Sequence, residues 1–562
     1  MTNVVTPRAA RRDVLPYLVG AATIVIALVF LVYPLASAVF GAFIKNGQAS
    51  SIANLTLVNF ERFFVSASYQ RALWNSLFAG TVSTALATLL ALPMAYAVAR
   101  VEMPFRALIL GLSVIPLISP PFIGAYSWIL LLGNNGLITQ VLNLYLGISL
   151  PSIYGPLGVI VALAFSYFPY VFLIVQGALV ASDPYIEEAA RMMGASRWHI
   201  LRTITFPLIL PSIAAGMLIV FIKALGDFGV PSILGGEFQV LPTLIYYQIH
   251  GFFNLNAAAA IAMVNVVLTV LALAVLARIN RKRNYATITG VARGAGRATN
   301  LGARLFANIY VWIVIVLAML PQAMVVFSSV VERWGGTLLP TAYGLDNYRR
   351  ILSGLGGPIV NSLTLSGLAT AACIVFGTLT AYASIRGKVV AKWALDIVIM
   401  LPFVLPGLVI GVAYLVAFND GWLVLTGTGS IVVLAYFTRR VAFIFRSASA
   451  SIAQVDSKLE EASTICGANW GTTMWRVTVP LIAPGILAGG ILVFATLIGE
   501  ISATVLLYSA KWKTISIAIY ELVLGDELAK ASALGTVTIV ITLVLVIGAS
   551  KLVSKNMAEM FR

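Results

Sequence analysis

Charged residues are the first thing that this chain lacks. Only 10% of its 562 residues are Asp, Glu, Lys or Arg, whereas an ordinary soluble domain carries roughly 25%. Hydrophobic residues make up 60% of the chain, and its mean hydropathy is +0.98. A water-soluble core could not bury so much apolar surface. The composition therefore excludes a soluble enzyme or binding module and indicates a protein that lies in a lipid bilayer.

Residues that carry redox, metal or nucleotide chemistry are also scarce. The two cysteines, Cys373 in an apolar run and Cys466 in a polar stretch, lie far apart in the sequence, and the two histidines are isolated. We therefore expect no disulfide and no metal site. The sequence has no Gly-x-x-x-x-Gly-Lys-Ser/Thr loop, the motif whose backbone holds nucleotide phosphates. We therefore expect that this chain has no catalytic site and binds no cofactor, and that any ATPase is a separate protein.

Long apolar runs are what the sequence has in abundance. A helix needs about 20 apolar residues to cross the hydrocarbon core of a bilayer, and twelve stretches come near that length. They are 16–40, 72–99, 107–132, 156–181, 207–225, 257–277, 308–330, 361–385, 393–417, 429–448, 481–507 and 531–552. The first run is too long for the apolar core of a signal peptide, so we expect it to be retained as a helix. The sequence thus predicts an all-α, polytopic membrane protein with about twelve transmembrane helices.

Basic residues lie between these runs and are unevenly distributed. The formal net charge is +16. If the N-terminus is cytoplasmic, that side carries 24 of the 36 lysines and arginines and the opposite side carries nine. This positive-inside bias predicts that both termini are cytoplasmic. The basic excess is explained by topology and by contact with anionic lipid, so nucleic acid is not an expected partner.

The chain also repeats itself. Matching residues recur at a displacement of 286 early in each half and of 273 later. Examples are Asn75-Ser76-Leu77 with Asn361-Ser362-Leu363, Pro120 with Pro406, Glu187-Glu188-Ala189 with Glu460-Glu461-Ala462, and Pro207 with Pro480. The repeat predicts an N-terminal half (1–277), a basic cytoplasmic linker (278–307) and a C-terminal half (308–562). Six spans of the same orientation in each half form a parallel repeat.

The two polar loops between the fourth and fifth spans of each half are the most informative segments. Each is predicted to form a short helix, a turn and a second helix. The expected N-caps are Asp183 and Asp456 for the first helices and Ser196 and Asn469 for the second helices. Gly194 and Gly467 suit the left-handed residue that ends the first helix. Small residues after the glutamates leave one helix face flat, so that a partner could approach closely.

The spacing in these loops resembles the EAA loop of ABC importer permeases of the type I, binding-protein-dependent class. That motif has Glu-Ala-Ala, three residues, Gly, nine residues and then Ile-x-Leu-Pro. The residues that fill its first part are Glu188, Ala189, Ala190 and Gly194 in one loop, and Glu461, Ala462, Ser463 and Gly467 in the other. Ser463 for Ala is a conservative departure. The fusion of two such halves in one chain resembles the ferric-iron transporter permeases.

The resemblance implies a mechanism and a set of partners. The loops would be coupling helices that dock onto two copies of a cytoplasmic ATPase, which would bind ATP and Mg²⁺. An extracytoplasmic substrate-binding protein would deliver the cargo, and the chain would lie in a bacterial inner membrane. Ferric iron is the first expectation for the cargo; thiamine, phosphonate, polyamine or another small polar or anionic solute are alternatives. A twelve-helix secondary transporter is an alternative of another class, but it leaves the doubled loops unexplained.

Four charged residues are candidates for the translocation pathway. Asp227 and Glu500, related by the displacement of 273, are expected near the outer ends of the fifth and eleventh spans. They could guide a hard cation through oxygen ligands or simply be solvated at helix ends. Arg439 and Arg440 fall inside the tenth span, where arginine is costly and tends to face protein or water. They could contact an anion in the pathway or extend toward the cytoplasm.

Overall fold

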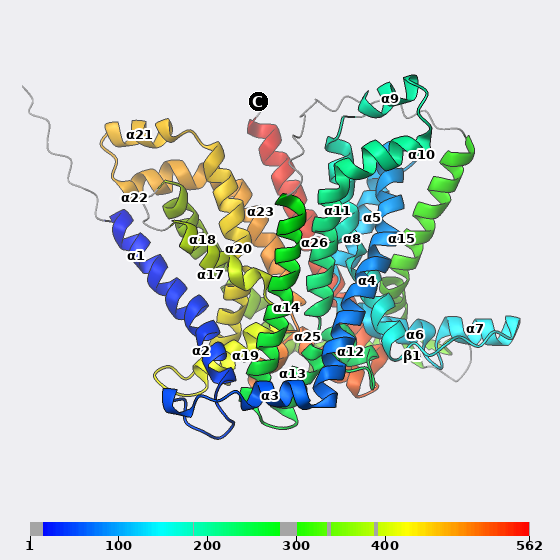
Figure 1. The fold of residues 1–562 in the computed structure, drawn as a ribbon, viewed down its shortest axis with the longest axis horizontal. Helices are drawn as coiled ribbons and strands as arrows, with labels where there is room; N and C mark the ends of the chain where they lie inside the picture. The colour runs from blue at the N-terminus through cyan, green and yellow to red at the C-terminus, as the bar shows by residue number, and fades with distance from the viewer. Residues whose placement is uncertain (1–14, 184, 282–300, 334–338, 387–391, 561–562) are drawn as a thin grey trace, which may run out of the picture.

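The computed structural model describes residues 15–183, 185–281, 301–333, 339–386 and 392–560. Most of the described chain is helical (Figure 1). Most of the predicted linker, residues 282–300, lies outside the described residues. Its flanks belong to long helices, because α14 runs to Arg281 and α15 starts at Leu301.

Seventeen helical segments make up the described part of the N-terminal half. They are α1 (Leu15–Ala27), η1 (Leu28–Val32), α2 (Tyr33–Ala42), η2 (Ile52–Asn54), α3 (Val58–Val65), α4 (Ala67–Arg100), α5 (Arg106–Ile118), α6 (Pro121–Leu132), α7 (Leu137–Leu146), α8 (Pro156–Ala181), α9 (Tyr185–Met192), α10 (Arg197–Ile200), η3 (Leu201–Thr205), α11 (Phe206–Leu225), α12 (Gly229–Leu234), α13 (Leu241–His250) and α14 (Leu255–Arg281).

The C-terminal half repeats this order with small changes. Its segments are α15 (Leu301–Ser329), β1 (Val331–Arg333), β2 (Ala342–Tyr343), α16 (Asp346–Gly354), α17 (Gly356–Ile385), α18 (Lys392–Val404), α19 (Gly407–Phe418), α20 (Gly429–Gln454), α21 (Ser457–Ile465), α22 (Trp470–Thr473), η4 (Met474–Thr478), α23 (Val479–Ile498), α24 (Thr504–Leu507), η5 (Ala510–Trp512), α25 (Ile515–Leu524) and α26 (Leu528–Met560). The two short strands pair antiparallel. Helices α8 and α20, and likewise α11 and α23, have equal lengths and bounds displaced by 273, so the repeat extends to the structure.

The number of membrane spans is slightly smaller than expected. Ten helical segments among the described residues are long and apolar enough to cross a membrane, and the pair α18 and α19, bent by 111°, could make an eleventh. The difference from twelve lies in α20, which is 26 residues long but carries Arg439, Arg440 and Arg446. The predicted third span, 107–132, falls on α5 and α6, whereas the apolar candidate there is Pro121–Leu146.

The first helix of each half packs against the other half. Helices α1 and α2 contact α17 and α19, and α15 contacts α4, α5 and α6 (Figure 1). Hydrogen bonds fix both crossings: the Tyr414 hydroxyl donates to the Phe30 carbonyl at 2.8 Å, and the Tyr310 hydroxyl donates to the Leu90 carbonyl at 3.1 Å. Phe30 lies in the π-helical turn η1, a kind of turn that disturbs the regular backbone ladder. The peripheral first helix that the family resemblance implied is thus exchanged between the halves.

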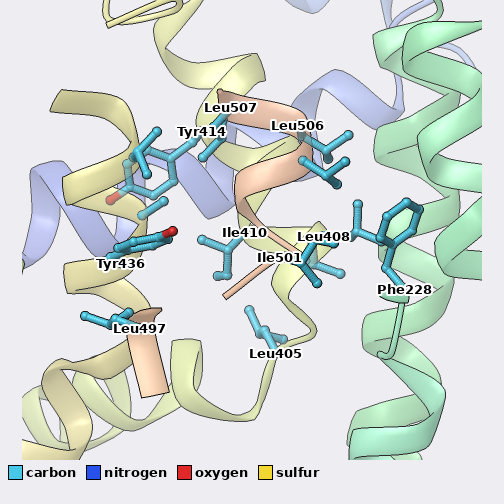
Figure 2. Packing of buried hydrophobic residues seen from close by; sticks show 14 of the residues in the cluster. Phe228, Leu405, Leu408, Ile410, Tyr414, Tyr436, Leu497, Ile501, Leu506 and Leu507 are labelled. Carbon is cyan, nitrogen blue, oxygen red and sulfur yellow. The ribbon is translucent and has the colours of Figure 1, made fainter. Parts of the chain in front are cut away.

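The two halves also meet in the interior, where glycines of one half lie close to proline rings of the other. A Cβ atom built on Gly226 would lie 2.8 Å from Pro406 Cβ, and one built on Gly499 would lie 2.4 Å from Pro120 Cγ. These four positions obey the repeat, so each half presents the same surface to the other. Figure 2 shows the buried side chains beside this contact, among them Phe228 of the first half and Leu408 of the second.

Candidate functional site

The two polar loops form the helix–turn–helix units that the sequence predicts. Asp183 Oδ1 accepts a hydrogen bond from the Tyr185 amide at 2.9 Å, and Asp456 Oδ1 accepts one from the Lys458 amide at 3.0 Å. The second helices are capped in the same way: the Ser196 hydroxyl accepts from the His199 amide, and the Asn469 side chain accepts from the Thr472 amide. All four predicted caps are confirmed.

The glycines that end the first helices adopt the expected left-handed conformation. The backbone φ is +86° at Gly194 and +87° at Gly467, and a Cβ atom at either position would meet nothing within 4 Å. The next residue closes the turn in both loops, with the Ala195 amide donating to the Ala190 carbonyl and the Ala468 amide donating to the Ser463 carbonyl. Backbone conformation, not crowding, is therefore what requires glycine here.

The motif residues of these loops have few contacts within the chain. The carboxylates of Glu188 and Glu461 have no hydrogen bond or ion pair in the described part of the chain, although the hydroxyl of Ser463 bonds to that of Thr473 at 2.9 Å. Ala190 is buried, Ala189 is exposed, and Ala462 is exposed. The motif carboxylates are therefore free to meet a second molecule.

Large apolar side chains surround these residues and are exposed. Met192, Met193 and Ile465 are 85%, 83% and 86% exposed. Others on the same segments are Tyr185, Ile186, Trp198, Leu459 and Trp475. Figure 1 places α9 and α10 at the same end of the molecule as α21 and α22. Clustered exposed apolar side chains of this kind mark an interaction surface.

Two carboxylates, one in each half, connect the loops to the membrane helices. The sequence alone did not identify them as functional residues. Glu187, directly before the motif glutamate, forms an ion pair with Arg100 at 3.1 Å and accepts a hydrogen bond from Thr205 at 3.1 Å. In the second half Glu460 accepts hydrogen bonds from Thr478 and Tyr382, each at 3.0 Å. Its ion pair with Arg386 is longer, at 3.8 Å. All three members of the Arg–Glu–Thr set recur at the displacements of the repeat. This recurrence could have marked them in the sequence as candidate functional residues.

The four candidate pathway residues lie in the interior. Asp227 and Glu500 follow the ends of α11 and α23 and are only 8% and 6% exposed, so neither is solvated at a helix end. Asp227 accepts a hydrogen bond from the Tyr167 hydroxyl at 2.5 Å and another from the Val230 amide, in the first turn of α12, at 2.8 Å. The structure thus removes the solvated alternative for both carboxylates.

The two arginines share one carboxylate partner. Arg439 forms an ion pair with Glu500, and Arg440 lies 3.6 Å from the same Glu500 oxygen. The Arg440 residue is 8% exposed, so it does not extend to the cytoplasm. No group of three or more His, Cys, Asp or Glu side chains suited to a resident metal occurs in the part of the chain that the structure describes.

Comparison with known proteins gives a consistent result. Residues 87–285 and 373–556 match the family described as binding-protein-dependent transport system inner membrane component. The chain is 29% identical to the ferric transport system permease protein FbpB of Actinobacillus pleuropneumoniae, over 94% of this chain and 77% of that protein. It is 31% identical to the putative ferric transport system permease protein FbpB 1 of Haemophilus influenzae, over 86% and 76%. A putative 2-aminoethylphosphonate transport system permease protein of Salmonella typhi is 33% identical over 41% of this chain and 88% of its own length.

Proposed function

Because the chain belongs to the family of binding-protein-dependent transport system inner membrane components, we propose that it carries ferric iron inward as the permease subunit of an ATP-driven importer. One observation supports the ATP-driven part above all others. Two loops related by the internal repeat present free carboxylates and exposed apolar side chains at one end of the molecule. A partner with two equivalent binding sites could bind both loops at once.

The proposed partner is a cytoplasmic ATPase that is present in two copies and binds ATP and Mg²⁺. Glu188 and Glu461 would face polar groups of the ATPase, while Met192, Met193 and Ile465 would fill apolar grooves on it. Burying such side chains contributes about 25 cal/mol per Å² of apolar surface. Closure of the ATPase pair would then move both loops together. The Arg100–Glu187 ion pair would pass this movement to α4.

Ferric iron is proposed as the cargo because two relatives that match most of this chain are named ferric transport permeases. The half-length relative is named for a phosphonate, so an anionic solute is the second candidate. An extracytoplasmic binding protein is proposed to deliver the cargo, in keeping with the family description. A secondary transporter is not supported, because a transporter driven by an ion gradient does not bind an ATPase and the two exposed loops would have no partner.

The proposed topology places both loops and both termini in the cytoplasm of a bacterium. The basis is the excess of lysine and arginine on that side. The loops and the C-terminal end of α26 lie at the same end of the molecule in Figure 1, which suits this orientation.

A purification experiment tests the docking loops. The tagged chain would be isolated with candidate ATPase subunits co-expressed, as wild type and as the Gly194→Trp/Gly467→Trp variant, which places bulk in open space on each loop. The control is Gly147→Trp, another left-handed glycine with open space around it, outside both loops. Recovery of an ATPase with wild type and control, but not with the double variant, is expected. A well-folded wild type that recovers no ATPase would refute the proposal.

The cargo is tested separately. Cells that contain the permease, the ATPase and the binding protein would be supplied with ⁵⁵Fe³⁺, and ATP-dependent uptake is expected to stop in the double variant. Uptake of a phosphonate but not of iron would move the assignment to the second candidate.

A further inference from the structure

We propose that the charged side chains between the two halves form a transit site for an anionic oxygen group, a phosphate-type oxyanion or a carboxylate. The anion would cross either on its own or as the companion of a metal ion. The proposal deepens the proposed function and rests on it for the direction of transport. It retains the assignment of Asp227, Glu500, Arg439 and Arg440 to the pathway.

The cluster draws on both halves of the chain. Arg439 and Arg440 come from α20, and Glu500 follows α23 of the same half. Lys223 comes from α11 of the other half, and its ammonium group interacts electrostatically with Arg439, Arg440, Glu500 and Asp227. The charged groups therefore lie at the junction where the halves meet.

Positive charge exceeds negative charge in this cluster. Three basic side chains lie near two carboxylates, and both carboxylates already have partners. Asp227 is held by a tyrosine hydroxyl and a backbone amide, and Glu500 is shared by both arginines. The side chain of Lys223 forms no hydrogen bond or ion pair with any described residue, and the residue is half-buried. The buried Nε of Arg440 also has no hydrogen-bond acceptor. Donors without acceptors in the interior are costly unless a ligand satisfies them.

The internal repeat shows that the fold does not require these cations. The position that matches Arg440 is Tyr167, which supports Asp227 through a neutral hydroxyl. The position that matches Lys223 is Thr496. At each of these two positions, one half has a basic residue and the other half has a neutral one. Since an uncompensated buried charge lowers stability, the extra cations of this chain have a role other than packing.

The sign of the excess selects the ligand. A bare trivalent cation would be repelled by Lys223 and the two arginines, whereas an oxyanion would supply acceptors to their free donors. Guanidinium groups match the geometry of phosphate and carboxylate oxygens. A metal ion that travels with such an anion presents less positive charge to the cluster. The half-length relative named for a phosphonate is consistent with this chemistry.

A binding experiment tests the site on the purified full-length chain in lipid nanodiscs. The probes are [³³P]phosphate, [¹⁴C]citrate and ferric [¹⁴C]citrate labelled with ⁵⁵Fe. The variants are Lys223→Thr, which installs the residue of the matching position, and Lys223→Arg, which keeps the charge. The control is Lys511→Thr, a lysine of η5 in an exposed position. Thermal stability is measured for each variant, and replacement of Lys223, whose side chain has no described partner, is expected not to lower it.

Saturable binding of at least one probe is expected in wild type, Lys223→Arg and Lys511→Thr, and at least about tenfold weaker binding in Lys223→Thr. Binding of phosphate or citrate alone identifies a free anion as the ligand, and binding of the ferric complex alone identifies an anion that accompanies the metal. No saturable binding to wild type, or equal binding to Lys223→Thr, would overturn the proposal. The test needs no ATPase, so the transit site and the proposed function can fail independently.

Discussion

Replacing Arg100 by methionine should release α9 from the membrane helix α4. The Arg100 guanidinium holds Glu187 at 3.1 Å and also donates to the Ser182 hydroxyl at 2.7 Å. Methionine preserves much of the side-chain volume but removes every donor. Glu187 would then keep only the hydrogen bond from Thr205.

The expected magnitude follows from the burial of the pair. Removing one member of a fully buried ion pair costs roughly 3–5 kcal/mol, whereas an exposed pair contributes at most about 1 kcal/mol. The side chains of Arg100 and Glu187 are 13% and 12% exposed, so we expect a cost of about 2 kcal/mol. This corresponds to about a 30-fold increase in local opening of the loop.

Amide hydrogen exchange measures that opening directly. Exchange in α9 should accelerate about 30-fold in Arg100→Met, while exchange in the membrane helices stays unchanged. The control is Arg304→Met. Arg304 pairs with Glu102 at 3.8 Å, and these two side chains are 46% and 57% exposed, so no acceleration is expected. Unchanged exchange of α9 in Arg100→Met would refute the claim that this pair fastens the loop.

Three further predictions concern the loops and the junction between the halves. The Glu188→Gln/Glu461→Gln variant should keep the stability of wild type, because neither carboxylate has a described partner in the chain, but should lower ATP-dependent ⁵⁵Fe uptake at least about tenfold. Gly194→Ala should destabilise the end of α9 by about 1–2 kcal/mol, because alanine disfavours the φ of +86°, and hydrogen exchange of the turn should rise accordingly. Gly499→Ala should lower the Tm by several degrees, because its Cβ would lie 2.4 Å from a proline of the other half, whereas Gly111→Ala, in open space, should not.

Local features of the loops could be predicted from sequence because their causes are local. An N-cap side chain bonds to an amide two or three residues later, as Asp183 and Asn469 do. A left-handed glycine is required by its own backbone, as at Gly194. The apolar runs likewise gave the long helices, since length and composition alone decide whether a helix can cross a membrane.

The partners of the charged residues could not be predicted in the same way. Arg100 and Glu187 are 87 residues apart, and only the fold brings them together. Their recurrence as Arg386 and Glu460 was visible in the sequence, but a repeat does not say which side chains meet. The solvated alternative for Glu500 failed for the same reason. A carboxylate at a helix end is solvated unless another element covers it, and here α20 supplies two arginines.

The exchange of first helices between the halves has a consequence for motion. Because α1 and α2 pack against the second half and α15 packs against the first, while α2 and α15 also contact their own halves, these helices bridge the two halves. Bridging helices of this kind would hold the halves together if the interior contact near Gly226 and Gly499 opened during transport. Large displacements can therefore be confined to the centre, and the lipid around the protein need not rearrange in each cycle.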